Sequence, residues 1–163
     1  MSDSPVDLRD LLDAPGTDFP DRPNLPGNKH FFGKLIDIKA GHSRNKGTPQ
    51  FEFGVRLTDP GKDVSREDLA PIFDAGFNLA DYNVTYVFYL TPKAMPMLWS
   101  FLESVGFQRT LGLRQALSLA PDGNPTAETI DKIRGLDVLC KTQPKDENGR
   151  VYSNLDTIVG VKR

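Results

Sequence analysis

Residues 50–58 read QFEFGVRLT, a stretch in which apolar and polar side chains alternate with a period of two. This alternation predicts a β-strand with one face in a core and the other toward solvent. The set expected to face inward comprises Phe51, Phe53, Val55 and Leu57. Arg56 belongs to the opposite set, so we expect it on the outer face.

Two further strands are predicted on either side of this one. Residues 30–40 (HFFGKLIDIKA) precede it, and the polar, basic loop 41–49 joins the two. Residues 82–90 (YNVTYVFYL) are rich in aromatic and β-branched residues, which favour a third strand. An insertion, residues 59–81, lies between the second and third predicted strands. In it, Ser65 followed by acidic residues predicts the start of a helix.

A helix is also predicted directly after the third strand. Thr91 and Pro92 fit a helix start, and apolar residues then recur at helical spacing up to Val105. Pro96 removes one backbone hydrogen bond inside such a helix. Either the first turn is therefore irregular, or the helix begins near Pro96.

The C-terminal third is predicted to hold one more helix and two strands. Asn124-Pro125 predicts the start of a helix that runs to about Arg134, whereas residues 107–124 show no clear pattern. Strands are predicted at 136–142 and 151–161. The polar turn between them contains Asn148-Gly149, a strong hairpin signal.

Three strands, a helix and two strands, in this order, are typical of the OB barrel. We therefore expect a mainly β protein, a five-stranded OB-fold barrel with a helix between strands three and four and extra short helices in the insertions. The ligand face of an OB fold lies on strands two and three, flanked by the first and last hairpin loops. These loops are residues 41–49 and 143–150 here.

Charge is unevenly distributed along the 163 residues, although the net charge is only −2. Residues 1–28 carry six aspartates, two arginines and five prolines, which predicts an acidic flexible arm or an extended wrap. Bases outnumber acids in residues 29–56 and again in residues 134–163. An OB barrel would bring these two basic blocks to opposite rims of one groove.

Four segments resemble phage-encoded single-stranded DNA-binding proteins with an OB fold, over about residues 29–163. They are GKLIDI (33–38), NKGTP (45–49) before the alternating aromatics, LTPK (90–93) before a helix that ends in VGF, and RGLDV (134–138) before the last hairpin and Asn154-Leu155. The resemblance implies a protein that coats and protects single-stranded DNA during replication, recombination or repair. The C-terminus departs from the bacterial single-strand binders, because Val161-Lys162-Arg163 is not their acidic tail.

A single strand of DNA presents phosphates and exposed base faces, so its groove needs cations and flat side chains. The candidate cations are Lys34, Arg44, Lys46, Arg56, Lys141, Lys145 and Arg150. Tyr89, on the outward set of the third strand, is the first stacking candidate, Tyr152 the second and Phe32 a weaker third. Phe51, Phe53 and Trp99 fit a core better.

Other chemistries find little support in the sequence. No apolar run reaches the ~18 residues of a membrane span, and the N-terminus lacks the apolar stretch of a secretory signal. The single cysteine, Cys140, excludes an internal disulfide and a multi-cysteine zinc site. Loop 41–49 lacks the Gly-Lys-Thr ending of a phosphate-binding loop, and no catalytic constellation is found. We therefore expect a non-enzyme without cofactor or metal, in the cytoplasm, or the host cytoplasm if phage-encoded.

A second function class stays open, an OB-fold adaptor between proteins of a replication or recombination complex. Apolar residues among the aspartates of the arm, Val6, Leu8, Leu11 and Leu12, suit docking on such a partner. Alternatively, the arm folds over the basic groove and competes with DNA, or it is a solubilising tail. Self-association of the predicted domain, residues 29–163, is also open.

Overall fold

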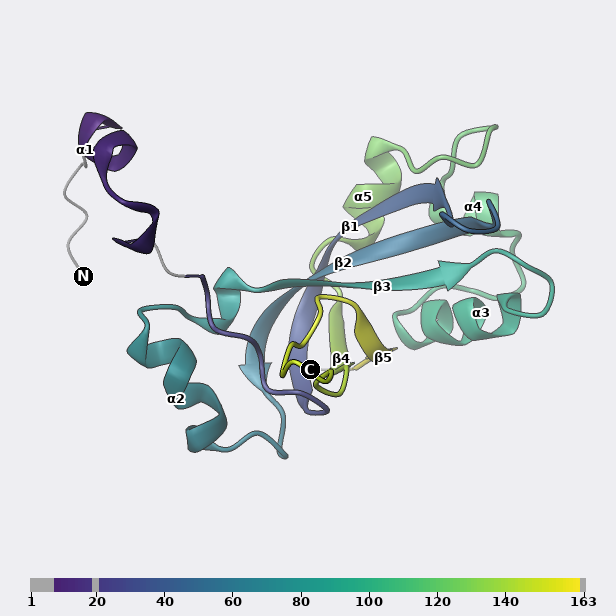
Figure 1. Cartoon of the computed structure of the whole chain (residues 1–163). Helices are drawn as coiled ribbons and strands as arrows, with labels where there is room; N and C mark the ends of the chain where they lie inside the picture. The colour runs from purple at the N-terminus through teal and green to yellow at the C-terminus, as the bar shows by residue number, and fades with distance from the viewer. Residues whose placement is uncertain (1–7, 19–20, 162–163) are drawn as a thin grey trace.

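One five-stranded sheet organises the protein, whose computed structural model describes residues 8–18 and 21–161 (Figure 1). The strands are β1 (His30–His42), β2 (Pro49–Pro60), β3 (Asn83–Tyr89), β4 (Asp137–Thr142) and β5 (Leu155–Gly160). Their order in the sheet is β3-β2-β1-β4-β5, and every neighbouring pair is antiparallel. The prediction of a mainly β fold with five strands is thus confirmed.

The sheet is not closed into a barrel. Its edge strands are β3 and β5, and within the described residues one isolated parallel bridge, between Thr85 and Asn154, connects the two edges. The backbone N–H of Thr85 donates to the carbonyl of Ser153 at 2.9 Å at the same place. The helix α3 (Met95–Ser104) contacts both edge strands.

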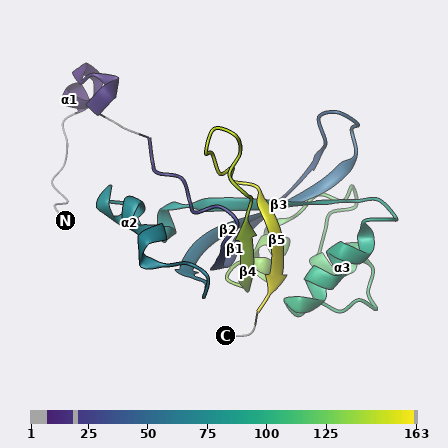
Figure 2. The same cartoon turned by 60° about the horizontal axis from the view of Figure 1, so that its bottom comes forward.

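The helices are short (Figures 1 and 2). They are α1 (Leu8–Asp13), α2 (Arg66–Asp74), α3 (Met95–Ser104), α4 (Leu113–Leu117) and α5 (Ala127–Ile133), with 3₁₀ turns η1 (Gly16–Asp18) and η2 (Leu79–Asp81). The connection between β3 and β4 holds α3, α4 and α5, so a helix does lie between the third and fourth strands. In Figure 1, α1 stands apart from the sheet.

The core forms as the alternation of β2 predicts. Phe51, Phe53, Val55 and Leu57 are almost fully buried, and Arg56 is exposed. Phe53 packs edge-on against Phe101 of α3, with ring centroids 5.2 Å apart. The aromatic rings of β2 are therefore committed to the core and cannot stack on a ligand.

Helix starts follow local hydrogen bonding. Ser65 caps α2 as predicted, because its hydroxyl accepts from the N–H of Asp68 at 3.1 Å and the Asp68 carboxylate accepts from the Ser65 N–H at 2.9 Å. The helix α3 begins at Met95, one residue before Pro96, so the proline lies in the first turn and interrupts no helical bond. The second of the two predicted alternatives is thus confirmed.

Two predicted caps are wrong. The N-cap of α3 is Ala94 and not Thr91. The helix α5 begins after Thr126, whose hydroxyl accepts from the N–H of Thr129 at 3.2 Å. Asn124 was expected in this role, but its own N–H donates to the Asp122 carboxylate at 3.0 Å in the preceding turn. The asparagine therefore closes that turn instead of starting the helix.

Residues 22–28 lie against the sheet, although they belong to the segment predicted as an arm. Leu25 is buried in the core, and the Thr142 hydroxyl donates to the carbonyl of Pro26 at 2.7 Å. The hydroxyl of Tyr82 donates to the carbonyl of Pro23, and the guanidinium of Arg22 lies 4.3 Å from the centre of the Tyr82 ring. We call residues 22–28 the strap, and the domain boundary at residue 28 stays a prediction.

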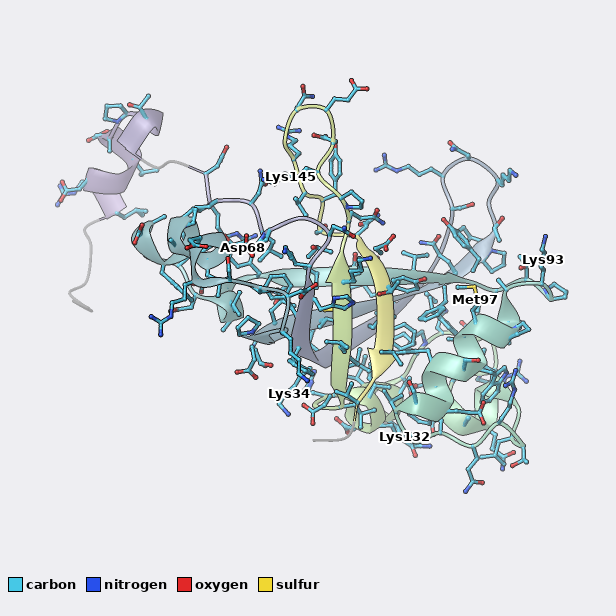
Figure 3. All side chains as sticks on the ribbon, turned by 90° about the horizontal axis from the view of Figure 1, so that it is seen from below. Lys34, Asp68, Lys93, Met97, Lys132 and Lys145 are labelled. Carbon is cyan, nitrogen blue, oxygen red and sulfur yellow. The ribbon has the colours of Figure 1, made fainter. Side chains whose placement is uncertain are left out.

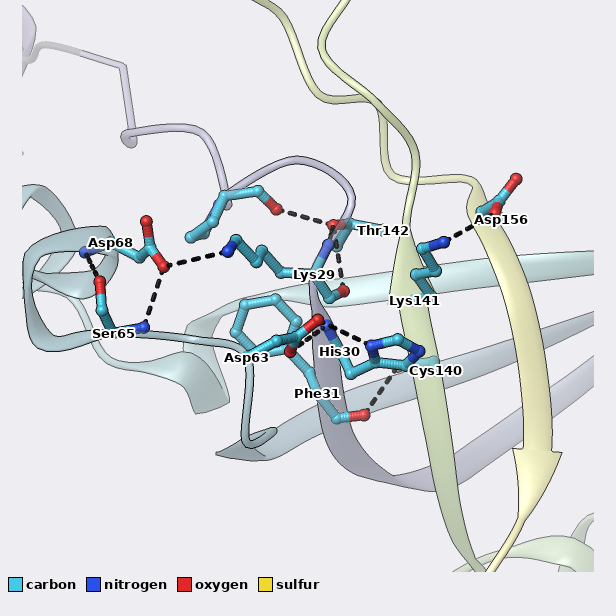
Figure 4. A network of polar contacts seen from close by, with 11 residues as sticks. Lys29, His30, Phe31, Asp63, Ser65, Asp68, Cys140, Lys141, Thr142 and Asp156 are labelled. Carbon is cyan, nitrogen blue, oxygen red and sulfur yellow. Dashed lines mark hydrogen bonds and ion pairs between the residues drawn. The ribbon is translucent and has the colours of Figure 1, made fainter.

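The end of the strap continues into a network of polar contacts (Figure 4). The N–H of Lys29 donates to the Thr142 hydroxyl at 3.1 Å, and the Lys29 ammonium lies 3.9 Å from the Asp68 carboxylate of α2. His30 Nδ1 lies 2.8 Å from the Asp63 carboxylate. These contacts hold the start of β1 between α2 and β4.

Candidate nucleic-acid interface

A hollow of about 1010 Å³ lies between the β1–β2 loop, the end of β3 and the start of α3. Three cationic side chains line it, Arg44 and Lys46 from the loop and Lys93 from the residues before α3. Figure 3 shows Lys93 and Met97 beside each other at this end of the sheet. Among the described residues, no aspartate or glutamate lines this hollow. We call it the loop hollow.

The β1–β2 loop is held by its own hydrogen bonds. The N–H of Ser43 donates to the carbonyl of Thr48 at 2.9 Å, and the N–H of Thr48 donates to the Ser43 hydroxyl at 3.0 Å. Gly47 closes the turn with a φ of 63°, a conformation that favours glycine. This short closed loop presents Arg44 and Lys46 to solvent, and both are exposed.

Apolar and aromatic side chains line the same hollow. Tyr89 is 47% exposed at the end of β3, where it lies opposite Gln50 of β2. Val87, two residues earlier, shares its face of the strand, and Met97 in the first turn of α3 is also exposed. Tyr89 is thus available for stacking, as the alternation of the third strand predicts.

The last hairpin loop does not join this hollow, contrary to the expectation that both basic loops line one groove. Lys145 lines a separate hollow of about 440 Å³ together with Lys29 and Asp68. Tyr152 lines a third, of about 170 Å³, beside Arg22 of the strap. Of the β4–β5 connection, Asn154 alone lines the loop hollow within the described residues.

Asp146 fixes the conformation of the β4–β5 loop and explains why β5 starts at Leu155, later than predicted. Its carboxylate accepts from the N–H of Asn148 at 2.9 Å, the N–H of Arg150 at 2.8 Å and the hydroxyl of Tyr152 at 3.0 Å. These hydrogen bonds, foremost that from Arg150, lower the pKa of Asp146 below its usual 3.8. Residues up to Tyr152 therefore belong to a closed turn, and Arg150 and Tyr152 are presented from it.

The remaining predicted cations lie elsewhere on the sheet. Lys34 pairs with Asp137 at 2.9 Å, and Lys141 lies 4.0 Å from the carboxylate of Asp156. Arg56 lies directly opposite Lys34 in the β1–β2 ladder, far along β2 from the loop hollow. Phe32 is half-buried beside β4 and lines none of the hollows described above.

The sequence reasoning missed two residues of the loop hollow, Lys93 and Met97. Lys93 belongs to a stretch that is acidic overall, so a count of charges by block passed over it. The motif LTPK directly after the third strand carried the signal, because it places Lys93 four residues beyond Tyr89, the last outward side chain of that strand. Met97 falls within the predicted helix but outside its apolar spacing, and its exposure depends on how α3 packs.

Side chains outside these hollows show few signs of reactive chemistry. Cys140 is buried, which raises the pKa of its thiol to about 12, and its Sγ lies 3.3 Å from the carbonyl of Phe31. Hydrogen bonding from His30 lowers the pKa of Asp63. In residues 8–18 and 21–161, no group of three or more histidine, cysteine or acidic residues is arranged to hold a metal ion. No helix in these ranges is long and apolar enough to span a membrane.

No protein-family model matches the chain, and no curated protein matches it either.

Proposed function

We propose that the protein binds single-stranded DNA through an OB-type domain and protects it during replication, recombination or repair. The observation that carries the proposal is the composition of the loop hollow. Three cations and a half-exposed tyrosine line it, with no carboxylate among its described lining residues, in a protein whose net charge is negative. This combination suits a polyanion that also offers flat bases.

The arrangement of the strands supports an OB-type domain. An OB fold is a five-stranded, partly open Greek-key barrel with the ligand face on strands two and three. The order β3-β2-β1-β4-β5, the helix α3 after β3 and the parallel bridge between Thr85 and Asn154 all fit such a barrel, opened between β3 and β5. The loop hollow lies on β2, β3 and the first hairpin loop, as this face requires.

The chemistry of the hollow favours a single strand over a duplex. Arg44, Lys46 and Lys93 are spaced around its rim and supply charge for phosphates. Tyr89, Val87 and Met97 offer an aromatic and apolar surface that only an unpaired base can reach with its face. Because neither contact reads the edge of a base, the proposed binding has little sequence preference.

The test is fluorescence anisotropy of the full chain with a labelled 30-nucleotide single strand and the matching duplex over a salt series. We expect tight binding to the single strand that weakens steeply with salt, and much weaker binding to the duplex. Equal affinity for both forms would contradict the role of base stacking. No binding of the single strand at low salt would refute the proposal.

A second candidate, a protein–protein adaptor, rests on α1. Leu8 and Leu12 are 66% and 71% exposed on this acidic helix, four residues apart and thus on one face. An exposed apolar face flanked by aspartates suits docking on a basic partner. This function would take precedence if the single strand does not bind.

A further inference from the structure

A second cationic hollow lies at the other end of β2, on the same face of the strand. It has a volume of about 360 Å³, and Lys34, Arg56 and Arg134 line it. Gln50, which lines the loop hollow, and Arg56 are an even number of residues apart, so their side chains lie on one face of β2. Six residues of strand span about 20 Å. We call this site the strand-end hollow.

Backbone contacts fix the three cations from three different segments. Lys34 and Arg56 are direct partners in the β1–β2 ladder. Arg134 directly follows α5, and the next residue, Gly135, donates its N–H to the carbonyl of Leu35 at 2.8 Å. The two basic blocks of the sequence, residues 29–56 and 134–163, therefore meet here.

The positive charge of this hollow is only partly balanced. The carboxylate of Asp137 pairs with Lys34 at 2.9 Å, whereas the described residues provide no ion pair or side-chain hydrogen bond for Arg56 or Arg134. Like charges directly opposite each other in a sheet are destabilising. Placing Lys34 opposite Arg56 beside a third cation thus costs stability, and a bound anion would offset that cost.

We propose that the strand-end hollow binds a phosphate group, and that this phosphate belongs to the same single strand that occupies the loop hollow. Two arginines bordering one hollow match the donor geometry that phosphate oxygens accept. This inference deepens the proposed function, because a strand held at both hollows would run along the outer face of β2. At the 3.4 Å spacing of stacked nucleotides, the 20 Å between them corresponds to about six nucleotides.

Two measurements on the full chain test the site separately from the proposed function. In the first, inorganic phosphate is titrated while NMR follows the backbone amides of Leu35 and Gly135. We expect saturable shifts in the wild type that R134A weakens at least several-fold. The variant R66A removes an equal charge on α2 and serves as the matched control, with shifts like those of the wild type.

The second measurement is the salt dependence of binding to the 30-nucleotide strand. R56A and R134A should each reduce the slope of log K against log salt by about 0.7, the contribution of one single-strand phosphate contact. D137N removes the carboxylate that pairs with Lys34, and it should tighten binding. Damage to the fold would not produce that gain.

The outcomes separate the two claims. Phosphate shifts without any binding of the strand would support the anion site and refute both the proposed function and the shared strand. If R56A and R134A bind the 30-nucleotide strand with the wild-type salt dependence and inorganic phosphate causes no shifts, the proposed function stands and this inference is overturned. Phosphate shifts with unaltered slopes would refute the shared strand alone.

Discussion

Removing the two loop cations, Arg44 and Lys46, tests how the proposed single-stranded DNA is bound. Both side chains are exposed, and neither belongs to the core cluster, so the double variant R44A/K46A should fold as the wild type does. Each side chain can neutralise one phosphate. Their loss should therefore change the salt dependence of binding and not only its strength.

The magnitude follows from counterion release. Each single-strand phosphate contact contributes about 0.7 to the slope of log K against log salt, so two lost contacts reduce the slope by about 1.4. Between 50 and 200 mM salt, that difference corresponds to about a sevenfold change in the ratio of the wild-type and variant affinities. The deficit of the variant should accordingly be larger at low salt.

Tyr89 provides the contrasting signature in the same assay. Stacking on an aromatic side chain contributes about 1–3 kcal/mol per base, so Y89A should weaken binding by about 5- to 150-fold. The slope should stay at the wild-type value, because the tyrosine releases no counterions. Y152A is the matched control, since that tyrosine is also exposed but lies outside the loop hollow.

Anisotropy titrations at four or more salt concentrations measure both quantities, and urea unfolding verifies that the variants are folded. The charge-conserving variant R44K/K46R should restore the slope. A wild-type slope in R44A/K46A, or a reduced slope with unchanged affinity in Y89A, would refute this division of roles.

Four further predictions follow from other parts of the fold. T142V should lower the free energy of unfolding by about 2 kcal/mol in urea denaturation, because it removes a buried hydroxyl that makes three hydrogen bonds. T142S should retain most of that free energy, and equal losses in the two variants would contradict this role of the hydroxyl. Since burial raises the pKa of Cys140 to about 12, its thiol should resist a thiol reagent at pH 8 and react once denaturant is added, and rapid labelling of the native protein would count against it. The pKa of Asp146 is lowered in the folded protein, so its hydrogen bonds stabilise the loop above pH 3.8 and are lost as the pH falls through the lower, folded-state pKa. The hydrogen-exchange rate of the Arg150 amide should rise as these bonds are lost. In D146N this rise should be absent. Removing residues 1–18 takes away α1 but keeps the strap, and it should tighten binding to single-stranded DNA a few-fold if the acidic arm competes, whereas unchanged affinity would eliminate that competition.

The strands could be predicted because their signals are local. The alternation in β2 and the density of aromatic residues in β3 determine which side chains are buried, and both patterns were read correctly at Phe53 and Tyr89. The start of α3 near Pro96 also follows from a local rule about proline. The start of β5 was predicted too early because Asp146 bonds to three later residues, which is a side-chain effect that a strand pattern does not contain.

The candidate site was predictable only in part, because it depends on which loops the sheet brings together. Arg44, Lys46 and Tyr89 meet as expected, since β2 and β3 are neighbours and the first loop follows from their pairing. The last hairpin loop was expected at the same groove, but Lys145 lies over the strap and α2 instead. The packing of the strap against the sheet could not be predicted from the sequence, since its prolines and polar residues resemble those of a flexible tail.

The strap has a consequence for how far β3 and β4 can move apart. At one end, Arg22 and Pro23 are attached to Tyr82, next to the first residue of β3, and at the other end Pro26 is attached to Thr142, the last residue of β4. These strands are not neighbours in the sheet, and three or four residues of chain can extend at most about 14 Å. The strap therefore acts as a short tether between the start of β3 and the end of β4. It sets an upper limit to how far these two strand ends can separate, whereas the opposite end of β3, beside the start of α3, has no such restraint from it.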